Sequence, residues 1–138
     1  KDPAYTENAD YIVMESTYGN RVHAQEKPDY LGDFTRILKE TFDRKGNVVI
    51  PSFAVGRTQE MLYFIREIKE KGLLSEYPDF EVYLDSPLAI EATKVFTKNM
   101  RECFDEEALA LVNAGINPLV FPGLHTAISS EDSKRSIL

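Results

Sequence analysis

Residues 48–68 read VVIPSFAVGRTQEMLYFIREI, and this stretch decides the fold class. Its first three residues form a β-branched run that is typical of a parallel strand covered on both faces. Small and turn-forming residues follow up to Gly56 and predict a tight reversal, after which Thr58 or a neighbour caps a helix. Apolar residues then recur at helical spacing and share one face: Met61, Leu62, Ile65 and Ile68. The stretch therefore predicts one strand, turn and helix unit.

The same order of elements is predicted on both sides of this unit. Residues 11–14 form a short apolar run that predicts a strand, and residues 29–43 carry the periodic pattern of a helix. Residues 80–84 predict a further strand, and Ser86 followed by Pro87 is a strong helix start. The inner face of that helix is predicted to carry Leu88, Ala92, Val95 and Phe96.

The last third of the chain predicts shorter elements. A helix is expected from about residue 105 to 112 with Gly115 just past its end, and residues 119–121 predict a short extended piece. Ser129 and Asp132 have the spacing of a capping box for a final helix. Three strand-helix units in series predict an α/β fold, namely a three-layer, mainly parallel, Rossmann-like sheet with helices on both faces.

Composition limits the class of protein. A chain of 138 residues with 43% hydrophobic residues is long and apolar enough for one domain with a real core. The formal charge of −7 has the wrong sign for a module that binds a nucleic acid backbone by itself. The only cysteine, Cys103, excludes an internal disulfide and fits a reducing compartment such as the cytoplasm. No apolar run approaches the roughly 20 residues of a membrane span, so no membrane role is expected.

Polar side chains follow each predicted strand at its carboxyl end. Because parallel strands end along one edge of a sheet, these residues are expected to converge on a binding site. The alternative is that they only cap helices or form local ion pairs, such as Glu15 with Arg21 or Arg57. The residues in question are Glu15, Ser16 and Thr17 after the first strand, Ser52 and Arg57 after the second, and Asp85 and Ser86 after the third.

Signatures of bound cofactors are absent from the sequence. No glycine-rich dinucleotide or P-loop motif follows any strand. His23, His125 and Cys103 are far apart in the sequence, so no zinc ligand set is predicted within this chain. Neither histidine has a context that pairs it with a serine nucleophile. Spacing alone thus predicts an α/β domain that does not carry a complete catalytic centre.

Three motifs resemble those of the β-CASP group of metallo-β-lactamase-fold nucleases. They are DYIVMESTYG at residues 10–19, followed by Arg21 and His23, then IPSFAVGRTQE at residues 50–60 and VYLDSPLA at residues 82–89. Their order and spacing match the family over most of the chain. The resemblance is to RNA-processing members of bacteria and archaea and to the endonuclease subunit of the polyadenylation machinery, rather than to DNA-repair members.

The resemblance implies that residues 1–138 are a single β-CASP cap domain within a larger two-domain protein. The partner would be a metallo-β-lactamase domain of the same chain, with RNA hydrolysed in the shared cleft. Two zinc ions are implied for the longer protein and none for this chain, because the H-x-H-x-D-H ligand run is missing. This chain alone is therefore expected to be inactive. Its first residues, Lys-Asp-Pro, and its last, Ser-Ile-Leu, also suggest that both ends are cut.

The resemblance also implies roles for individual residues. Glu15 falls on the acidic motif position, where the family's carboxylate holds a histidine from a later motif and helps to position the proton donor. Arg57 suits bidentate contact with a phosphate. The substrate-binding residues are expected to be Ser16, Thr17, Tyr18, Ser52, Arg57, Asp85 and Ser86.

Two other functions fit the sequence. One is a free-standing α/β module that binds a nucleotide or a sugar phosphate at the same strand edge. The other is a protein-interaction cap whose exposed sheet edge pairs two subunits into a homodimer.

Overall fold

The computed structural model describes residues 5, 7–22, 28–127 and 129–135. His23, named above in the first motif, lies outside these residues. In the described part, helices and two short strands follow one another along the chain. They are α1 (Tyr30–Asp43), α2 (Arg57–Glu70), β1 (Val82–Leu84), α3 (Pro87–Lys98), α4 (Met100–Cys103), α5 (Glu106–Asn113), β2 (Leu124–Thr126) and α6 (Ser130–Arg135).

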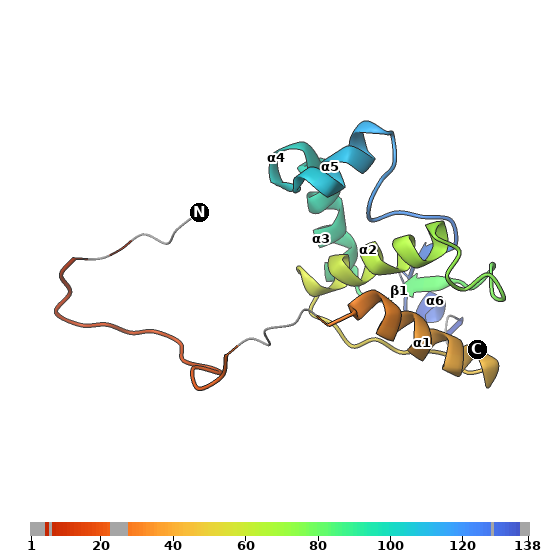
Figure 1. The fold of residues 1–138 in the computed structure, drawn as a ribbon, viewed down its shortest axis with the longest axis horizontal. Helices are drawn as coiled ribbons and strands as arrows, with labels where there is room; N and C mark the ends of the chain where they lie inside the picture. Colours follow the sequence, from red (N-terminus) through yellow and green to blue (C-terminus); the bar gives the residue numbers. More distant parts are fainter. Residues whose placement is uncertain (1–4, 6, 23–27, 128, 136–138) are drawn as a thin grey trace.

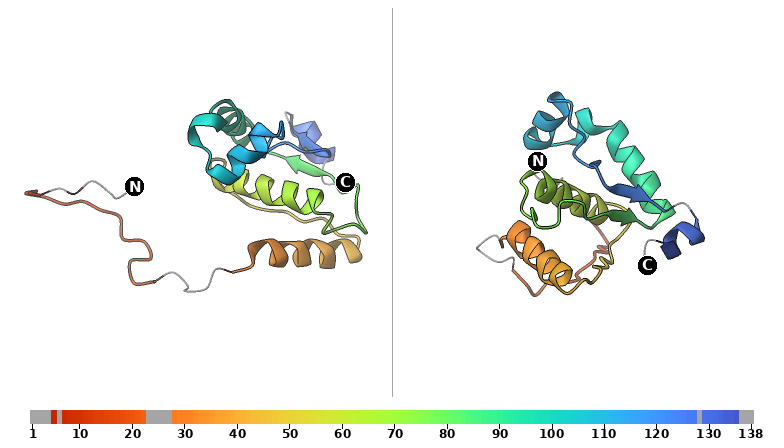
Figure 2. Two further views of the ribbon diagram at one scale, coloured as in Figure 1. Left: turned by 45° about the horizontal axis from the view of Figure 1, so that its top comes forward. Right: turned by 90° about the vertical axis from the view of Figure 1, so that its right-hand side faces the viewer.

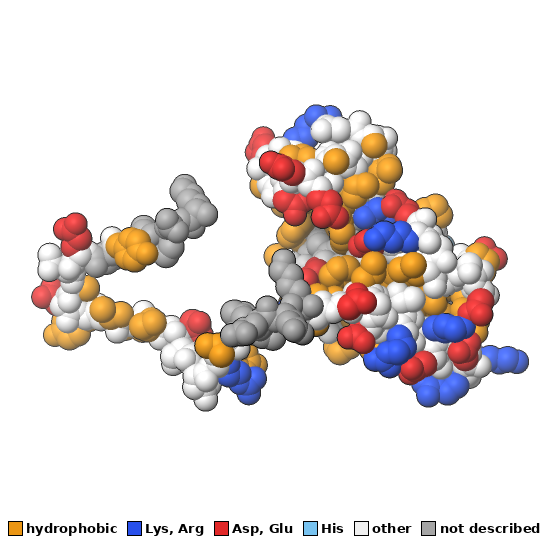
Figure 3. Space-filling view, viewed as in Figure 1, with side chains coloured by type: hydrophobic (Ala, Val, Ile, Leu, Met, Phe, Trp, Pro, Cys, Tyr) orange, Lys and Arg blue, Asp and Glu red, His pale blue; other side chains and the backbone are white. Residues whose placement is uncertain are grey.

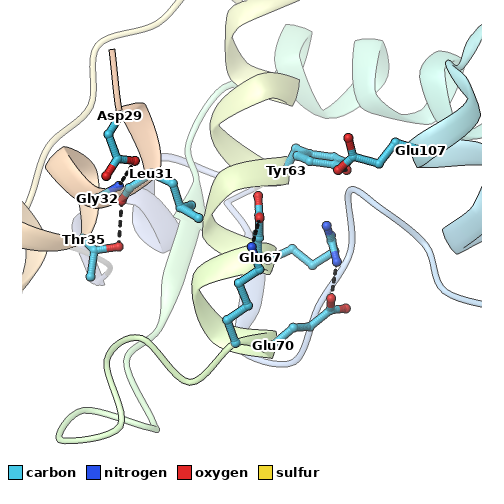
Figure 4. A network of polar contacts seen from close by, with 10 residues as sticks. Asp29, Leu31, Gly32, Thr35, Tyr63, Glu67, Glu70 and Glu107 are labelled. Carbon is cyan, nitrogen blue, oxygen red and sulfur yellow. Dashed lines mark hydrogen bonds and ion pairs between the residues drawn. The ribbon is translucent and has the colours of Figure 1, made fainter. Parts of the chain in front are cut away.

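Several helices begin at side-chain caps, of which the sequence predicts Ser86. The Asp29 carboxylate accepts a hydrogen bond from the Gly32 amide at the start of α1, as Figure 4 shows. Ser86 and Asp105 cap α3 and α5 in the same way. Each cap satisfies an amide that has no partner within its own helix, which fixes where the helix starts. Gly115, at φ +81°, follows α5 as predicted.

The two strands form a parallel pair. Val82 is the register partner of Leu124, and Tyr83 is that of His125. One face of the pair packs on α2 through a core cluster of Leu62, Ile65, Leu119 and Phe121, with Val82, Leu84 and Leu124 against it. Tyr83 and His125 point to the opposite face and stay largely exposed. The α/β class is thus confirmed, and the three-layer arrangement is confirmed in part.

Helix α1 lies along α2, as the views in Figures 1 and 2 agree. A second core cluster joins them: Leu38 from α1, Ile68 from α2 and Leu74 from the following turn. Ile68 is completely buried. Tyr63 of α2 also donates a hydrogen bond to Glu107 of α5 at 3.1 Å, so α2 contacts both α1 and α5.

The predicted strand at residues 11–14 does not form. These residues run extended, away from the body of the molecule, and the Val13 side chain is fully exposed. Figure 3 shows hydrophobic side chains standing free along this segment. A strand needs hydrogen-bonding neighbours, and none of the described residues pairs with this segment.

Two more predicted strands are also missing or displaced. Residues 48–50 run extended between α1 and α2 but belong to no ladder, and Val49 is 85% exposed instead of covered on both faces. Leu119 and Phe121 are packed in the core without strand pairing, Val120 between them is exposed, and the strand forms at Leu124–Thr126 instead. The apolar pattern therefore identified Leu119 and Phe121 as core residues, but it did not identify which residues form the second strand.

Two local predictions are corrected. The buried residues of α3 are Ala89 and Thr93, whereas Leu88 and Val95 are 66% and 61% exposed. The helix is rotated so that the Thr93 hydroxyl reaches a partner on α2. The N-cap of α2 is Gly56, not Thr58. Within the described residues, no helix is long and apolar enough to cross a membrane.

Candidate functional site

A hollow of about 1130 Å³ lies between two of the three predicted strand exits, those at Ser52 and at Asp85. Residues 45–52 line one side and residues 77–86 line the other, with α1 and α2 behind them. We call it the strand-edge hollow. Residues 48–50 lie across this hollow from β1 and make no ladder with it. Ser52, Asp85 and Ser86 all line it, so the structure brings these three predicted site residues together.

The Ser52 hydroxyl is hydrogen-bonded to Thr58, a residue that was not predicted to belong to the site. Its Oγ lies 2.8 Å from Thr58 Oγ1, and Thr58 Oγ1 donates to the Phe53 carbonyl, also at 2.8 Å. A hydroxyl has a single hydrogen, so Ser52 is the donor toward Thr58. The lone pairs of Ser52 Oγ therefore remain available on the side of the hollow.

Three consecutive amides at the start of α2, those of residues 56–58, already have acceptors. Gly56 N–H donates to Gln59 Oε1 at 2.7 Å, and Arg57 and Thr58 N–H donate to the Val55 and Phe53 carbonyls. Helix N-termini bind phosphate when their first amides are open. Here the first amides are already used, which argues against a free-standing phosphate site at this turn.

Arg57 extends outward from the same turn. Its side chain is 60% exposed and pairs with Glu60 one turn further along α2. It does not line the strand-edge hollow. An exposed ion pair of this kind is weak and exchanges readily for another anion, so the guanidinium can be recruited by a ligand that approaches from outside.

Asp85 and Ser86 follow the end of β1, and their side chains bind different partners. Ser86 Oγ accepts the Ala89 N–H at 3.2 Å as the N-cap of α3. The Asp85 carboxylate instead accepts a hydrogen bond from Ser133 Oγ of α6. The helix-capping alternative is therefore correct for Ser86, while Asp85 joins the strand exit to the last helix of the described chain.

Glu15 and the residues after it form a compact turn of their own. Glu15 Oε2 accepts the Thr17 N–H at 2.8 Å, and the Ser16 carbonyl accepts the Gly19 N–H at 2.9 Å. Tyr18 takes φ +62°, an uncommon value for a residue with a side chain. The Arg21 guanidinium lies 4.8 Å from the Tyr18 ring centroid. The turn is locally ordered although it stands apart from the strand-edge hollow (Figure 1).

The structure thus assembles part of the predicted site. Ser52, Asp85 and Ser86 share the hollow, and Arg57 stands beside it. The predicted residues of the first motif do not join them: Glu15, Ser16, Thr17 and Tyr18. Figure 1 shows their segment running away from the body of the molecule that carries β1.

Side chains that could bind a metal ion do not gather in one place in the described part of the chain. Nowhere in the described ranges do three His, Cys, Asp or Glu side chains come close enough to bind a metal ion. The described residues of this chain therefore do not fit a metal site by themselves. His125 instead lies 3.5 Å from Glu81, and Cys103 is an exposed free thiol.

The open face of the strand pair carries a polar cluster that the sequence reasoning missed. Tyr83 donates a hydrogen bond to Glu81 Oε2 at 2.7 Å. This hydrogen bond, together with the nearby His125, lowers the pKa of Glu81 below its ordinary value of 4.5. Lys69 donates to the Phe80 carbonyl at 2.7 Å, and burial lowers its pKa below 10.5. Tyr83 and His125 thus form an exposed pair beside Glu81, and Lys69 reaches the start of β1 from the last turn of α2.

Four residues of the site were not predicted: Thr58, Gln59, Thr93 and Ser133. A signal for Gln59 was present, because Gly56 and Gln59 have the spacing of an N-cap and the N3 residue whose side chain reaches back to it. No local pattern identifies Thr93 or Ser133, because their partners lie 34 and 48 residues away in the sequence.

Comparison with known proteins gives concordant matches. A family model described as "Beta-Casp domain" matches residues 58–138. Ribonuclease TTHA0252 of Thermus thermophilus is 35% identical over 133 residues, which is 96% of this chain and 29% of that protein. Transcription termination factor FttA of a Lokiarchaeum species is 31% identical over 130 residues, 92% of this chain and 19% of that protein. Probable RNase MJ4 of Methanocaldococcus jannaschii is 38% identical over 96 residues, covering 68% of this chain and 20% of that protein.

Proposed function

The chain belongs to the Beta-Casp family, and from this we propose that residues 1–138 form the cap domain of a longer, metal-dependent ribonuclease. RNA would be hydrolysed in a cleft between this domain and a metallo-β-lactamase domain of the same chain. The observation that carries the proposal is the alignment of nearly the whole chain with a protein named as a ribonuclease. The chain spans less than a third of the length of that relative and of FttA, which supports a longer parent protein.

The charge of the chain supports a shared cleft over a self-sufficient RNA site. The net charge is −7, and on the face shown in Figure 3 acidic and basic side chains are interspersed over the body. A single strand of RNA needs a positive groove that follows its backbone. We assign that positive groove mainly to the partner domain, with Arg57 as the contribution of this chain.

The strand-edge hollow supplies the cap side of this cleft. Ser52, Asp85 and Ser86 offer hydroxyl and carboxylate oxygens that can hydrogen-bond to ribose hydroxyls, while Arg57 suits a backbone phosphate. Asp85 repels phosphate, so the hollow favours the sugar side of the strand. This division of roles fits RNA, whose 2′-hydroxyl is both donor and acceptor.

The segment with Glu15 completes the site from the other side. Tyr11, Ile12, Val13 and Met14 are exposed apolar residues in an extended conformation, and such a run is stabilised when it pairs with a sheet and is covered. We place it in the sheet of the metallo-β-lactamase domain. Glu15, Ser16, Thr17 and Tyr18 then lie at the edge of the cleft, where the Glu15 carboxylate accepts a hydrogen bond from the group that protonates the leaving oxygen.

The metal of the parent protein is proposed to be zinc, two ions per chain, bound by residues outside the part that the structure describes. When bound, such a pair activates water and stabilises the charge on the scissile phosphate. The residues of this chain then bind and orient the RNA. A free exposed thiol, Cys103, is compatible with the reducing cytoplasm, where we place the protein.

The test compares this chain with the parent protein side by side. Metal content is measured by mass spectrometry, and cleavage is measured on a labelled single-stranded RNA with a DNA of the same sequence as control. The proposal predicts that only the parent binds about two zinc ions per chain and cuts, and that RNA is the better substrate. Cleavage by residues 1–138 alone, or a parent that leaves RNA intact, would overturn it.

A further inference from the structure

Gln59 is a buried polar residue, and both the oxygen and the nitrogen of its side-chain amide form hydrogen bonds. It is 3% exposed, and its amide has three partners. Oε1 accepts the Gly56 N–H at 2.7 Å, while Nε2 donates to the Ala54 carbonyl at 3.2 Å and to Thr93 Oγ1 at 2.9 Å. Leaving a buried amide group without a hydrogen-bond partner is unfavourable, because the group has also lost its contact with water. The three hydrogen bonds therefore fix the orientation of the Gln59 side chain.

Thr93 continues this connection into α3. Its hydroxyl donates to the Ala89 carbonyl at 2.8 Å and accepts from Gln59. Ala89 N–H in turn donates to Ser86 Oγ, the cap at the start of α3. We call the contacts of Gln59 with Gly56, Ala54 and Thr93 the Gln59 bridge. It joins the loop that carries Ser52 and Arg57 to the helix turn that carries Ser86.

An apolar residue would pack the two helices equally well. Leucine at position 59 fills a similar volume, but it would leave the Gly56 N–H and the Ala54 carbonyl without their partner. The choice of an amide at this buried position therefore serves the loop and not only the contact between helices. The loop benefits from such support because Gly56, at φ +85° and ψ −72°, has the conformation of a γ-turn, which is rare and strained.

We propose that Gln59 is a positioning residue, whose bridge to Thr93 holds the loop of residues 52–57 at a fixed place relative to Ser86 for RNA binding. The effect on RNA rests on the proposed function, whereas the effect on the loop does not. Gln59 itself touches no ligand. Its contribution is to keep Ser52, Arg57 and Ser86 arranged before RNA arrives, which lowers the cost of ordering them on binding.

The first experiment measures amide hydrogen exchange in the 138-residue chain. Gln59→Leu is compared with Leu74→Val, a core substitution in the other cluster that lowers stability without contacting the loop. In Gln59→Leu the exchange rate of the Gly56 amide is expected to rise about tenfold more than that of the Leu38 amide, because the Gly56 N–H loses its acceptor. In Leu74→Val both amides should change together. Equal changes at Gly56 and Leu38 in Gln59→Leu would overturn the proposal.

The second experiment uses a milder pair of variants in the longer protein. Thr93→Val keeps the shape and removes the acceptor for Gln59, and Thr93→Ser restores it. We expect Thr93→Val to raise KM for single-stranded RNA about threefold or more with kcat within about twofold. Thr93→Ser should return KM to the wild-type value, and Leu74→Val should lower Tm without changing KM.

The two experiments separate the inference from the function on which it rests. An unchanged KM in Thr93→Val, or a KM that Thr93→Ser fails to restore, contradicts a positioning role. A wild-type parent that does not cut RNA overturns the proposed function and the RNA role of the bridge together. Amide exchange at Gly56 then still decides whether the Gln59 bridge holds the loop.

Discussion

Tyr83 and His125 stack across the two strands, with ring centroids 5.0 Å apart and an angle of 24° between the rings. Both rings also approach one carboxylate, since Tyr83 donates a hydrogen bond to Glu81 and His125 lies 3.5 Å from it. The pairing of β1 with β2 is what brings His125 to this place. The part of the Glu81 pKa shift that comes from His125 therefore depends on the strand register, whereas the part from Tyr83, the largest single cause, does not.

Tyr83→Phe is expected to raise the pKa of Glu81 toward its ordinary value. The substitution keeps the ring that stacks on His125 and removes the hydroxyl that is the largest cause of the lowered pKa. The titration of the Glu81 side-chain carbons, followed by nuclear magnetic resonance, measures the shift. An unchanged titration would show that the hydrogen bond is not formed in solution.

His125→Gln is the matched control for this prediction, because His125 is a smaller cause of the same shift. The pKa of Glu81 should rise less in His125→Gln than in Tyr83→Phe. The sign for stability follows from the direction of the shift. A carboxyl whose pKa is lowered by folding stabilises the folded state above pH 4.5, and this contribution is lost as the pH falls through the folded-state pKa. Tyr83→Phe should weaken that acid-side dependence.

Ile68→Ala is expected to lower the free energy of unfolding by about 2–5 kcal/mol. Ile68 is completely buried and joins α2 to Leu38 and Leu74, so its truncation leaves a cavity where two helices meet. Val95→Ala removes a smaller apolar group at a position that is 61% exposed, and it should change stability by no more than about 0.5 kcal/mol. Urea unfolding of both variants measures the difference. Similar losses in the two would contradict the packing described for α2.

Helices were predictable from the sequence because their signals are local. Asp29 and Ser86 cap helices within three residues of the amides they bind, and Gly115 ends one at a positive φ. Strands were less predictable because a strand exists only with its partner. Residues 11–14 and Leu124–Thr126 are equally short, but only the second meets a neighbour among the described residues.

The candidate site was predictable where it depends on the ends of elements. Ser52, Asp85 and Ser86 do line one hollow, but residues 48–50 form no strand, so the rule that parallel strands end along one edge accounts only for the residues after β1. The contacts that hold them were not predictable, because Gln59 with Thr93 and Asp85 with Ser133 are long-range polar pairs. The apolar pattern of α3 was right for Phe96, which packs against the core cluster, and wrong for Leu88 and Val95. The helix turns its Thr93 hydroxyl inward to satisfy Gln59, and Leu88 and Val95 are left exposed.

Arg57→Ala in the longer protein is expected to weaken binding of single-stranded RNA about threefold to tenfold and to lower its salt dependence by about one phosphate contact. Arg57 pairs only with Glu60 on the surface in the described structure, so RNA phosphate can replace that partner. Arg36→Ala is the control, because Arg36 has a similar exposure, 58%, and pairs with Asp33 and Glu40 on α1. Fluorescence anisotropy at several salt concentrations measures both variants. If both substitutions weaken RNA binding equally, the loss of affinity comes from the change in net charge and not from a contact made by Arg57.

Glu15 is tested by two substitutions that separate its charge from its hydrogen bond. Glu15→Gln keeps an oxygen that can accept the Thr17 N–H, while Glu15→Ala removes both the oxygen and the charge. If the carboxylate supports proton transfer, both variants of the longer protein should lose kcat by about 10²-fold or more. If Glu15 only shapes the turn, Glu15→Gln should keep nearly full activity. Glu7→Gln removes the same charge from the same extended segment and should have no effect, and an undiminished rate in Glu15→Ala would remove Glu15 from the mechanism.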